Sequence, residues 1–377
     1  MNDMLAPLSG WVGGFVAAVT GLALGRFLTA TVSRWLGERS RLSRLIELCV
    51  VATAMGLWWW EVPAGGLTPL TASGGLSDLP TATLLTRWAS HCVFFTLLAA
   101  ATWVDMRYRV IPDEITVTGV VLGLAVACLL PDPLLPVGWE QERSFAPPAI
   151  LPDVLGAFGG LRASPAPAWL GGMPQIGGLA LAGGIFVAWW FFCTAPFIEA
   201  QGSGLATLSR SVSEPRNLVL VAGLVGIMIA WFSGGHRFDA LQSSLIGLAV
   251  AAGLVWGVRE GASRAMGREA MGFGDVTLMA MIGTWLGWQP SVMVFFIATF
   301  LGLAHGLLGL LLHRDNELPY GPSLCLAAGL VVVGWRSLWQ QVDEFFADPL
   351  LLAVVLVAVV VLTAVALWVW QWVRNAR

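Results

Sequence analysis

The chain has 377 residues and a net charge of −3, and 57% of its residues are hydrophobic whereas only 11% are charged. A soluble domain carries about a quarter charged residues, so this composition and a mean hydropathy of +0.77 exclude an ordinary soluble protein. Twenty tryptophans and 44 glycines are typical of membrane helices, because Trp anchors helices at the headgroup level and Gly lets them approach closely. No basic stripe with interleaved aromatic residues indicates a nucleic-acid partner. We therefore expect the lipid bilayer to surround most of the chain.

Apolar runs of about 17 to 25 residues, which cross a hydrocarbon core of about 30 Å, recur along the whole sequence. The first run lacks the basic n-region of a signal peptide and is predicted to be a retained helix. Two segments rich in Gly, Pro, Ser and Thr are expected to be loops outside the membrane, 63–85 and 131–175. The candidate spans, in chain order, are 8–31, 45–62, 88–106, 113–131, 176–198, 216–233, 240–258, 273–288, 291–312, 321–338 and 349–373. They predict an all-α, polytopic integral membrane bundle with about 9–11 transmembrane helices.

The arginines are unevenly divided between successive loops, and this asymmetry predicts how the helices are oriented. With the N-terminus outside, the inner loops and the C-terminal tail hold most of the arginines, whereas the outer loops and outer helix ends hold few. Positive charge accumulates on the cytoplasmic side of membrane proteins. We therefore expect an N-terminus outside and a C-terminus in the cytosol.

Two aspartates lie at the ends of predicted spans on the cytosolic side. Asp105 ends the apolar run 94–105, and Asp275 follows a Gly-x-Gly sequence at the start of a later span. A carboxylate at membrane depth is costly unless it is paired or hydrated, so each aspartate is a candidate functional residue. Either one alone is equally consistent with a simple acid at a helix end. Together, the two acids are predicted to lie at one membrane depth and on one side.

Two carboxyl groups at one depth suit an aspartic peptidase. When such groups lie close together they share one proton, so that one activates water while the other donates to the scissile carbonyl. Gly272 and Gly274 lack a Cβ atom, and we expect them to let another backbone approach Asp275 and to let the chain bend into the helix. The positive end of the helix dipole favours the ionised form of Asp275.

The sequences around both aspartates resemble the two signature regions of the type IV prepilin peptidases, the GxGD family of intramembrane aspartic peptidases. These regions are VDMRYRVIPDEIT at 104–116 and MGFGDVTLMAMIGTWLGW at 271–288. Weaker matches are GLALGRFL at 21–28, SRLIEL at 43–48 and ELPYGPS at 317–323, where Tyr320 stands in place of a Phe in the family's turn. The resemblance covers roughly residues 10–62, 88–131 and 240–335.

This resemblance implies that Asp105 and Asp275 are catalytic and that no cofactor is needed. It implies an aspartic endopeptidase of the bacterial inner membrane that removes the basic leader from type IV prepilin or pseudopilin precursors at the cytosolic face. Typical members carry a cytosolic domain with paired CxxC motifs after the first helix, and many methylate the new N-terminus. Here that loop is only about 34–44 and contains no cysteine, so we expect neither zinc nor methyltransferase activity. The five cysteines stand far apart in apolar runs, and no metal site or disulfide framework can be built from them.

Three further acids are candidates for binding the substrate. Asp113 and Glu114 follow a proline at a helix start, where acids are also favoured simply as N-terminal residues. Glu47 lies early in the second span and is suited either to the positive charge of a leader or to an ordinary helix start. His305 lacks a metal-spaced partner and is expected to pack within its helix, while the Trp run 58–60 is expected to form an interfacial belt.

Three other functions compete with the peptidase. A proton- or ion-coupled transporter would use the same intramembrane carboxylates, but it predicts acids near the bilayer centre and an internal repeat. A non-enzymatic membrane scaffold would tolerate loss of both carboxylates. A presenilin-like GxGD protease is disfavoured, because Val104 precedes Asp105 where Tyr is wanted and because 318–320 reads Leu-Pro-Tyr instead of Pro-Ala-Leu.

The sequence divides into four predicted regions. Residues 1–131 hold the first four helices and the first aspartate, and 132–239 form an inserted outer loop with two helices. Residues 240–338 hold the GxGD helices, and 339–377 add a C-terminal helix. The oligomeric state has no signature in the sequence.

Overall fold

The computed structural model describes residues 10–36, 43–68, 81–130, 134–136, 175–199, 215–233, 235–267, 269, 271–311, 320–347, 354–358, 361 and 365. The described elements are α-helices, as the sequence predicts, and this part of the chain contains no β-strand. The helices are α2 (Trp11–Leu36), α3 (Ser43–Glu61), α4 (Thr81–Tyr108), α5 (Asp113–Leu129), α7 (Gln175–Glu199), α9 (Pro215–Ser233), α10 (Gly235–Met266), α11 (Phe273–Leu286), α12 (Trp288–Leu311) and α13 (Gly321–Ala347). Ten predicted spans therefore each coincide with a helix, and the eleventh, 349–373, lies largely outside the described residues.

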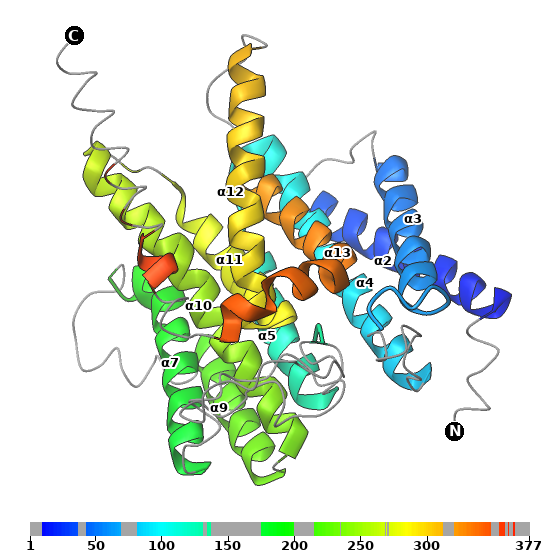
Figure 1. Ribbon diagram of the computed structural model, residues 1–377, viewed down its shortest axis with the longest axis horizontal. Helices are drawn as coiled ribbons and strands as arrows, with labels where there is room; N and C mark the ends of the chain where they lie inside the picture. The colour runs from blue at the N-terminus through cyan, green and yellow to red at the C-terminus, as the bar shows by residue number, and fades with distance from the viewer. Residues whose placement is uncertain are drawn as a thin grey trace.

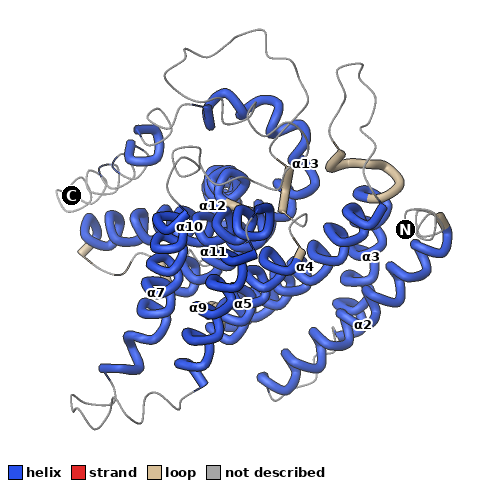
Figure 2. The backbone as a smooth tube through the Cα atoms, turned by 90° about the horizontal axis from the view of Figure 1, so that it is seen from below, coloured by secondary structure: helices blue, strands red, loops and turns tan. Residues whose placement is uncertain are grey.

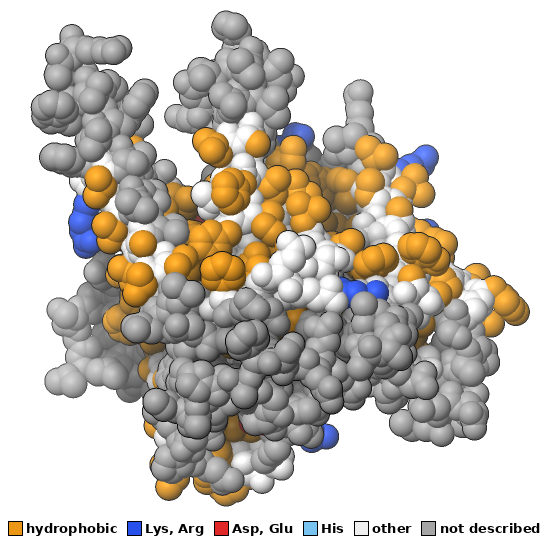
Figure 3. Space-filling model, in the orientation of Figure 1, with side chains coloured by type: hydrophobic (Ala, Val, Ile, Leu, Met, Phe, Trp, Pro, Cys, Tyr) orange, Lys and Arg blue, Asp and Glu red, His pale blue; other side chains and the backbone are white. Residues whose placement is uncertain are grey.

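Length and composition confirm a multi-pass membrane protein. Five of the described helices are long and apolar enough to cross a bilayer: 11–33, 81–108, 176–193, 237–266 and 321–342. Three shorter apolar helices accompany them, at 217–233, 273–286 and 288–304. The described surface carries many exposed apolar side chains, which is the expected outer face of a protein in lipid (Figure 3).

The bundle has a central helix with other helices packed around it. Two flanks are visible in Figure 2, where α2 and α3 lie beside α4 on one side while α7 and α9 lie beside α10 on the other. Between them α11 contacts α5, α10, α12 and α13, and every residue from Asp275 to Leu286 is buried. A helix that is apolar all round belongs in a protein interior. At about 1.5 Å per residue α11 is about 21 Å long. The burial of its residues shows that neighbouring helices cover it on every side.

Glycine permits the closest helix contact in the bundle. Gly247 of α10 and Gly283 of α11 face each other, and a Cβ atom added to either one would overlap the backbone of the other helix. Trp285 fastens the opposite side of α11, because its indole Nε1 donates a 2.9 Å hydrogen bond to the carbonyl of Gly119 in α5. Small residues at helix crossings allow this backbone-to-backbone packing in membranes. These contacts fix α11, and with it Asp275, relative to α5 and α10.

Three helices run further than their apolar stretches predict. Helix α4 begins at Thr81, seven residues before the predicted start of the span at 88. Helix α10 continues to Met266, beyond the predicted end at 258, and α13 continues to Ala347, beyond the predicted end at 338. The added segment of α4 contains Arg87, which is 3% exposed. Hydropathy marks only the part of a helix that contacts lipid or apolar side chains, so polar turns at the helix ends are missed.

Candidate active site

The two predicted aspartates lie at the C-terminal end of α4 and at the N-terminal end of α11, two helices labelled in Figure 1. Asp105 lies in the last turn of α4 and is 5% exposed, while Asp275 lies in the first turn of α11 and is 8% exposed. Each carboxyl is buried among apolar side chains, and the charge of Asp105 acts on Asp275. A third residue, Cys325 of α13, interacts electrostatically with both carboxyls and hydrogen-bonds with Thr102. The fold therefore brings together two acids that are 170 positions apart in the sequence.

The N-terminus of α13 completes the surroundings of Asp105. The backbone N–H of Gly321, the first residue of α13, donates to the Asp105 carboxylate, and the positive end of the helix dipole adds to this attraction. A Cβ atom on Gly321 would overlap Oδ2 of Asp105 and lie 3.0 Å from Cδ1 of Ile111. Glycine is therefore required at 321 for the backbone to approach the carboxyl group. Oδ2 of Asp105 is itself buried and has no hydrogen-bond partner, so it remains available to a water or a reacting group.

The two predicted glycines of the GxGD sequence play different parts. A Cβ atom on Gly274 would lie 3.0 Å from Cβ of Ile111 and 3.4 Å from its carbonyl oxygen, so Gly274 permits the close approach of another backbone to the start of α11. Gly272 is the N-cap of α11 with φ −65° and ψ 150°, and a Cβ there would meet only the amide of Gly274, at 4.0 Å. Neither the contacts nor the backbone angles require glycine at 272.

Arg259, which was not predicted to belong to the site, binds the loop that precedes Asp275. The Nε atom of Arg259 in α10 donates a 3.0 Å hydrogen bond to the carbonyl of Met271, and its guanidinium pairs with Glu269. The same guanidinium lies 5.9 Å from the ring centre of Phe273. In the sequence Arg259 is one of several loop arginines, and only the folded loop shows that it fastens the entry to α11.

Tyr320 adds a hydroxyl group beside the pair. Its side chain hydrogen-bonds with Thr299 of α12, and its ring packs against Gly302, where an added Cβ would lie 3.0 Å from Cε2. Burial raises the pKa of the Tyr320 hydroxyl, the hydrogen bond with Thr299 lowers it, and negative charge on Asp275 raises it again. In the sequence Tyr320 is noticeable only as a substitution within a turn. Its proximity to Asp275 arises only when α13 packs against the other helices, so the sequence could not reveal it.

The three acids predicted to bind substrate occupy two different places. Asp113 and Glu114 lie exposed in the first turn of α5, just after the segment that joins the end of α4 to α5. Asp113 acts electrostatically on Cys193 of α7, which places it beside the α7 flank. Glu47 instead faces α2, where its Oε1 accepts a 3.0 Å hydrogen bond from Thr29. The structure thus gives Glu47 a partner within the bundle.

A second polar cluster, also missed by sequence reasoning, lies toward the opposite end of α4. Oε1 of Glu61 and Nδ1 of His91 are 2.7 Å apart, and both side chains are 1% exposed. The remaining polar atoms of the pair, Oε2 of Glu61 and Nε2 of His91, are buried without partners. His305, by contrast, lies among residues whose side chains are not described.

Metal-binding groups do not gather in the described part of the chain. No three His, Cys, Asp or Glu side chains within it are arranged to hold a metal ion. Its five cysteines are free thiols.

The fold and this site define a polytopic helical membrane protein in which two aspartates from different helices are buried together at one end. Residues 211–307, which contain Asp275, match the model of the type IV leader peptidase family. This similarity agrees with the resemblance found in the sequence motifs.

Curated relatives named prepilin leader peptidase/N-methyltransferase support this assignment. The chain is 34% identical to the protein from Aeromonas salmonicida over 104 residues, which cover 26% of this chain and 32% of the relative. It is 31% identical to the Dichelobacter nodosus protein over 156 residues, or 41% of this chain and 50% of the relative. The Escherichia coli K12 protein is 26% identical over 161 residues, covering 42% and 66%. The chain thus spans about a third of the length of the first of these relatives. No solved structure matches it.

Proposed function

We propose that this protein is an intramembrane aspartic endopeptidase that removes the leader from type IV prepilin-like or pseudopilin precursors. The observation that carries the proposal is the buried pair of Asp105 and Asp275, whose carboxyls interact electrostatically. The match of residues 211–307 to the type IV leader peptidase family and the names of the relatives support the class of substrate.

The chemistry follows from two acids that share one proton. The ionised carboxylate takes a proton from water as the water oxygen attacks the scissile carbonyl carbon, and the protonated carboxyl donates to the carbonyl oxygen. When the tetrahedral intermediate collapses, the amide nitrogen takes up a proton and leaves as the new amino terminus. The unpartnered Oδ2 of Asp105 is suited to hold the attacking water. The N–H of Gly321 donates to the same carboxyl group and helps to hold it in place.

The orientation of the protein follows from the same residues. Arg107 and Arg109 follow Asp105, while Arg259 and Arg264 precede the loop that leads to Asp275, so the active-site end of the bundle is rich in positive charge. By the positive-inside rule we propose that this end faces the cytosol of a bacterial inner-membrane protein, with the N-terminus outside and the C-terminus in the cytosol. A basic leader ahead of an apolar segment would present its scissile bond at this interface.

In vitro processing of a prepilin tests the proposal. The purified protein in detergent is mixed with a prepilin, and leader loss is scored on a gel. Wild type and Asp239→Asn, which changes an exposed acid near the start of α10, should both cleave. Asp105→Asn and Asp275→Asn should not. Robust processing by a well-folded Asp275→Asn variant would remove the aspartic mechanism and favour the transporter instead.

A further inference from the structure

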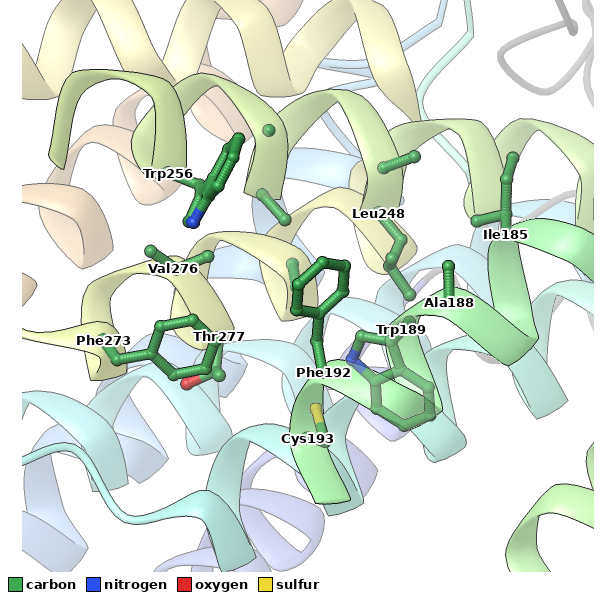
Figure 4. A pocket seen from close by; sticks show the side chains of 14 residues that line it. Ile185, Ala188, Trp189, Phe192, Cys193, Leu248, Trp256, Phe273, Val276 and Thr277 are labelled. Carbon is green, nitrogen blue, oxygen red and sulfur yellow. The ribbon is translucent and has the colours of Figure 1, made fainter. Parts of the chain in front are cut away.

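A groove lies beside the candidate active site, between α7, α10 and α11. Its volume is about 270 Å³. Its lining is apolar apart from the Thr277 hydroxyl and the Cys193 thiol, and Figure 4 shows the side chains of all three helices facing it. Phe192 of α7 and Trp256 of α10 remain 57% and 46% exposed. The groove is therefore open to the surface and can accept large apolar side chains.

One wall of the groove belongs to the helix that carries Asp275. Phe273, Val276 and Thr277 line it, and they follow the spacing that places residues on one face of a helix. Asp275 lies at the same level of α11, on the side of the helix away from this face. An occupant of the groove would thus lie along the first two turns of α11, and its end would reach the carboxyl pair past the N-terminus of this helix.

Negative charge lies at the same end of the groove. Asp113 and Glu114 are exposed at the start of α5, and Asp113 acts electrostatically on Cys193, which lines the groove. An apolar channel with an acidic pair at its end complements a segment that is apolar along its length and basic at one end. A lipid acyl chain fits the apolar lining equally well, but an anionic headgroup would be repelled by the acids.

We propose that this groove docks the apolar helix of the substrate, with the basic residues of the leader beside Asp113 and Glu114. This inference rests on the proposed peptidase function and adds the binding site. The opposite wall is supplied by α7 (Gln175–Glu199), which precedes the residues that match the family model, 211–307. The choice among precursors would then depend on Phe192 and its neighbours in α7.

Photo-crosslinking tests where the precursor lies. Phe192 is replaced by p-benzoyl-phenylalanine in an Asp275→Asn background, so that uncleaved prepilin accumulates. The matched control carries the same photoreactive residue at Phe232, which is 75% exposed on α9. Position 192 should capture prepilin and position 232 should not. Capture at 192 of lipid only, or of a second copy of this chain only, would overturn the proposal.

Filling the groove tests its contribution to cleavage. A Cβ atom added to Gly253 of α10, which lines the groove, meets no atom within 4 Å, so Gly253→Leu projects into open space without disturbing the packing. Gly226 of α9 is equally free of neighbours, and Gly226→Leu is the control. We expect Gly253→Leu to raise KM for the prepilin about tenfold with kcat little changed, because docking and not chemistry is impaired. If wild type cleaves prepilin and Gly253→Leu leaves KM unchanged, docking in the groove is refuted but the proposed function is not. If wild type cleaves no prepilin, the proposed function itself is refuted.

Discussion

The contact between Gly321 and Asp105 gives a quantitative prediction. In Gly321→Ala the new methyl group would overlap Oδ2 of Asp105 and would lie 3.2 Å from its Cγ and 3.0 Å from Cδ1 of Ile111. Gly321 does not have a positive φ, so alanine introduces no backbone strain and the effect is steric. The carboxyl must therefore move away from the N–H of Gly321. Both aspartates stay chemically intact.

The expected loss of activity follows from the size of that displacement. Misplacing a reacting group by about 1 Å can lower the rate about 100-fold, which corresponds to about 2.7 kcal/mol in the activation free energy. We therefore expect the kcat of Gly321→Ala for prepilin cleavage in detergent to fall about 100-fold. The control is Gly56→Ala in α3, where an added Cβ meets no atom within 4 Å, and it should retain wild-type activity. Full activity in a well-folded Gly321→Ala variant would show that the placement of Asp105 does not matter for the reaction.

Three further predictions concern packing and charge. Gly283→Leu should lower the melting temperature, because the side chain must enter the contact with Gly247 and overpacking costs about 1–3 kcal/mol; an unchanged melting temperature would contradict the tight crossing. His91→Phe should destabilise the protein by about 3–5 kcal/mol, because it leaves the buried Glu61 carboxylate without its partner, and denaturant unfolding of Glu61→Gln, His91→Phe and the double variant should show strong non-additivity. Asp113→Asn should lower prepilin cleavage only partially, and the difference from wild type should shrink as salt is added.

Most of the fold could be predicted because membrane helices are marked by the length of their apolar runs. Ten predicted spans each coincide with a helix, including the short span at 273–288, which corresponds to α11. The predicted boundaries were wrong where a helix ends in polar residues. The additional turns of α4, α10 and α13 contain polar and charged residues, so their mean hydropathy is too low to mark them as part of a span.

The candidate site was only partly visible in the sequence. Asp105 and Asp275 stood out because a carboxylate next to a long apolar run is rare, and family motifs surround both. Cys325 and Arg259 carry no such signal, and Tyr320 was marked only as a substitution within a family turn. The contacts of all three residues form only when the helices pack together. The Glu61–His91 pair was missed for the same reason, since Glu61 reads as an ordinary acid at a helix end.

The rates of the single and double aspartate variants test the central claim most directly. If Asp105 and Asp275 share one proton, each Asp→Asn change removes the acid–base pair, and the second change has little left to remove. Initial rates of prepilin cleavage are measured for wild type, Asp105→Asn, Asp275→Asn and the double variant, with folding of each checked by thermal unfolding in detergent. We predict that both single variants are nearly inactive and that the double variant is little worse than either. Losses that multiply, or one single variant that keeps substantial activity, would contradict a shared catalytic pair.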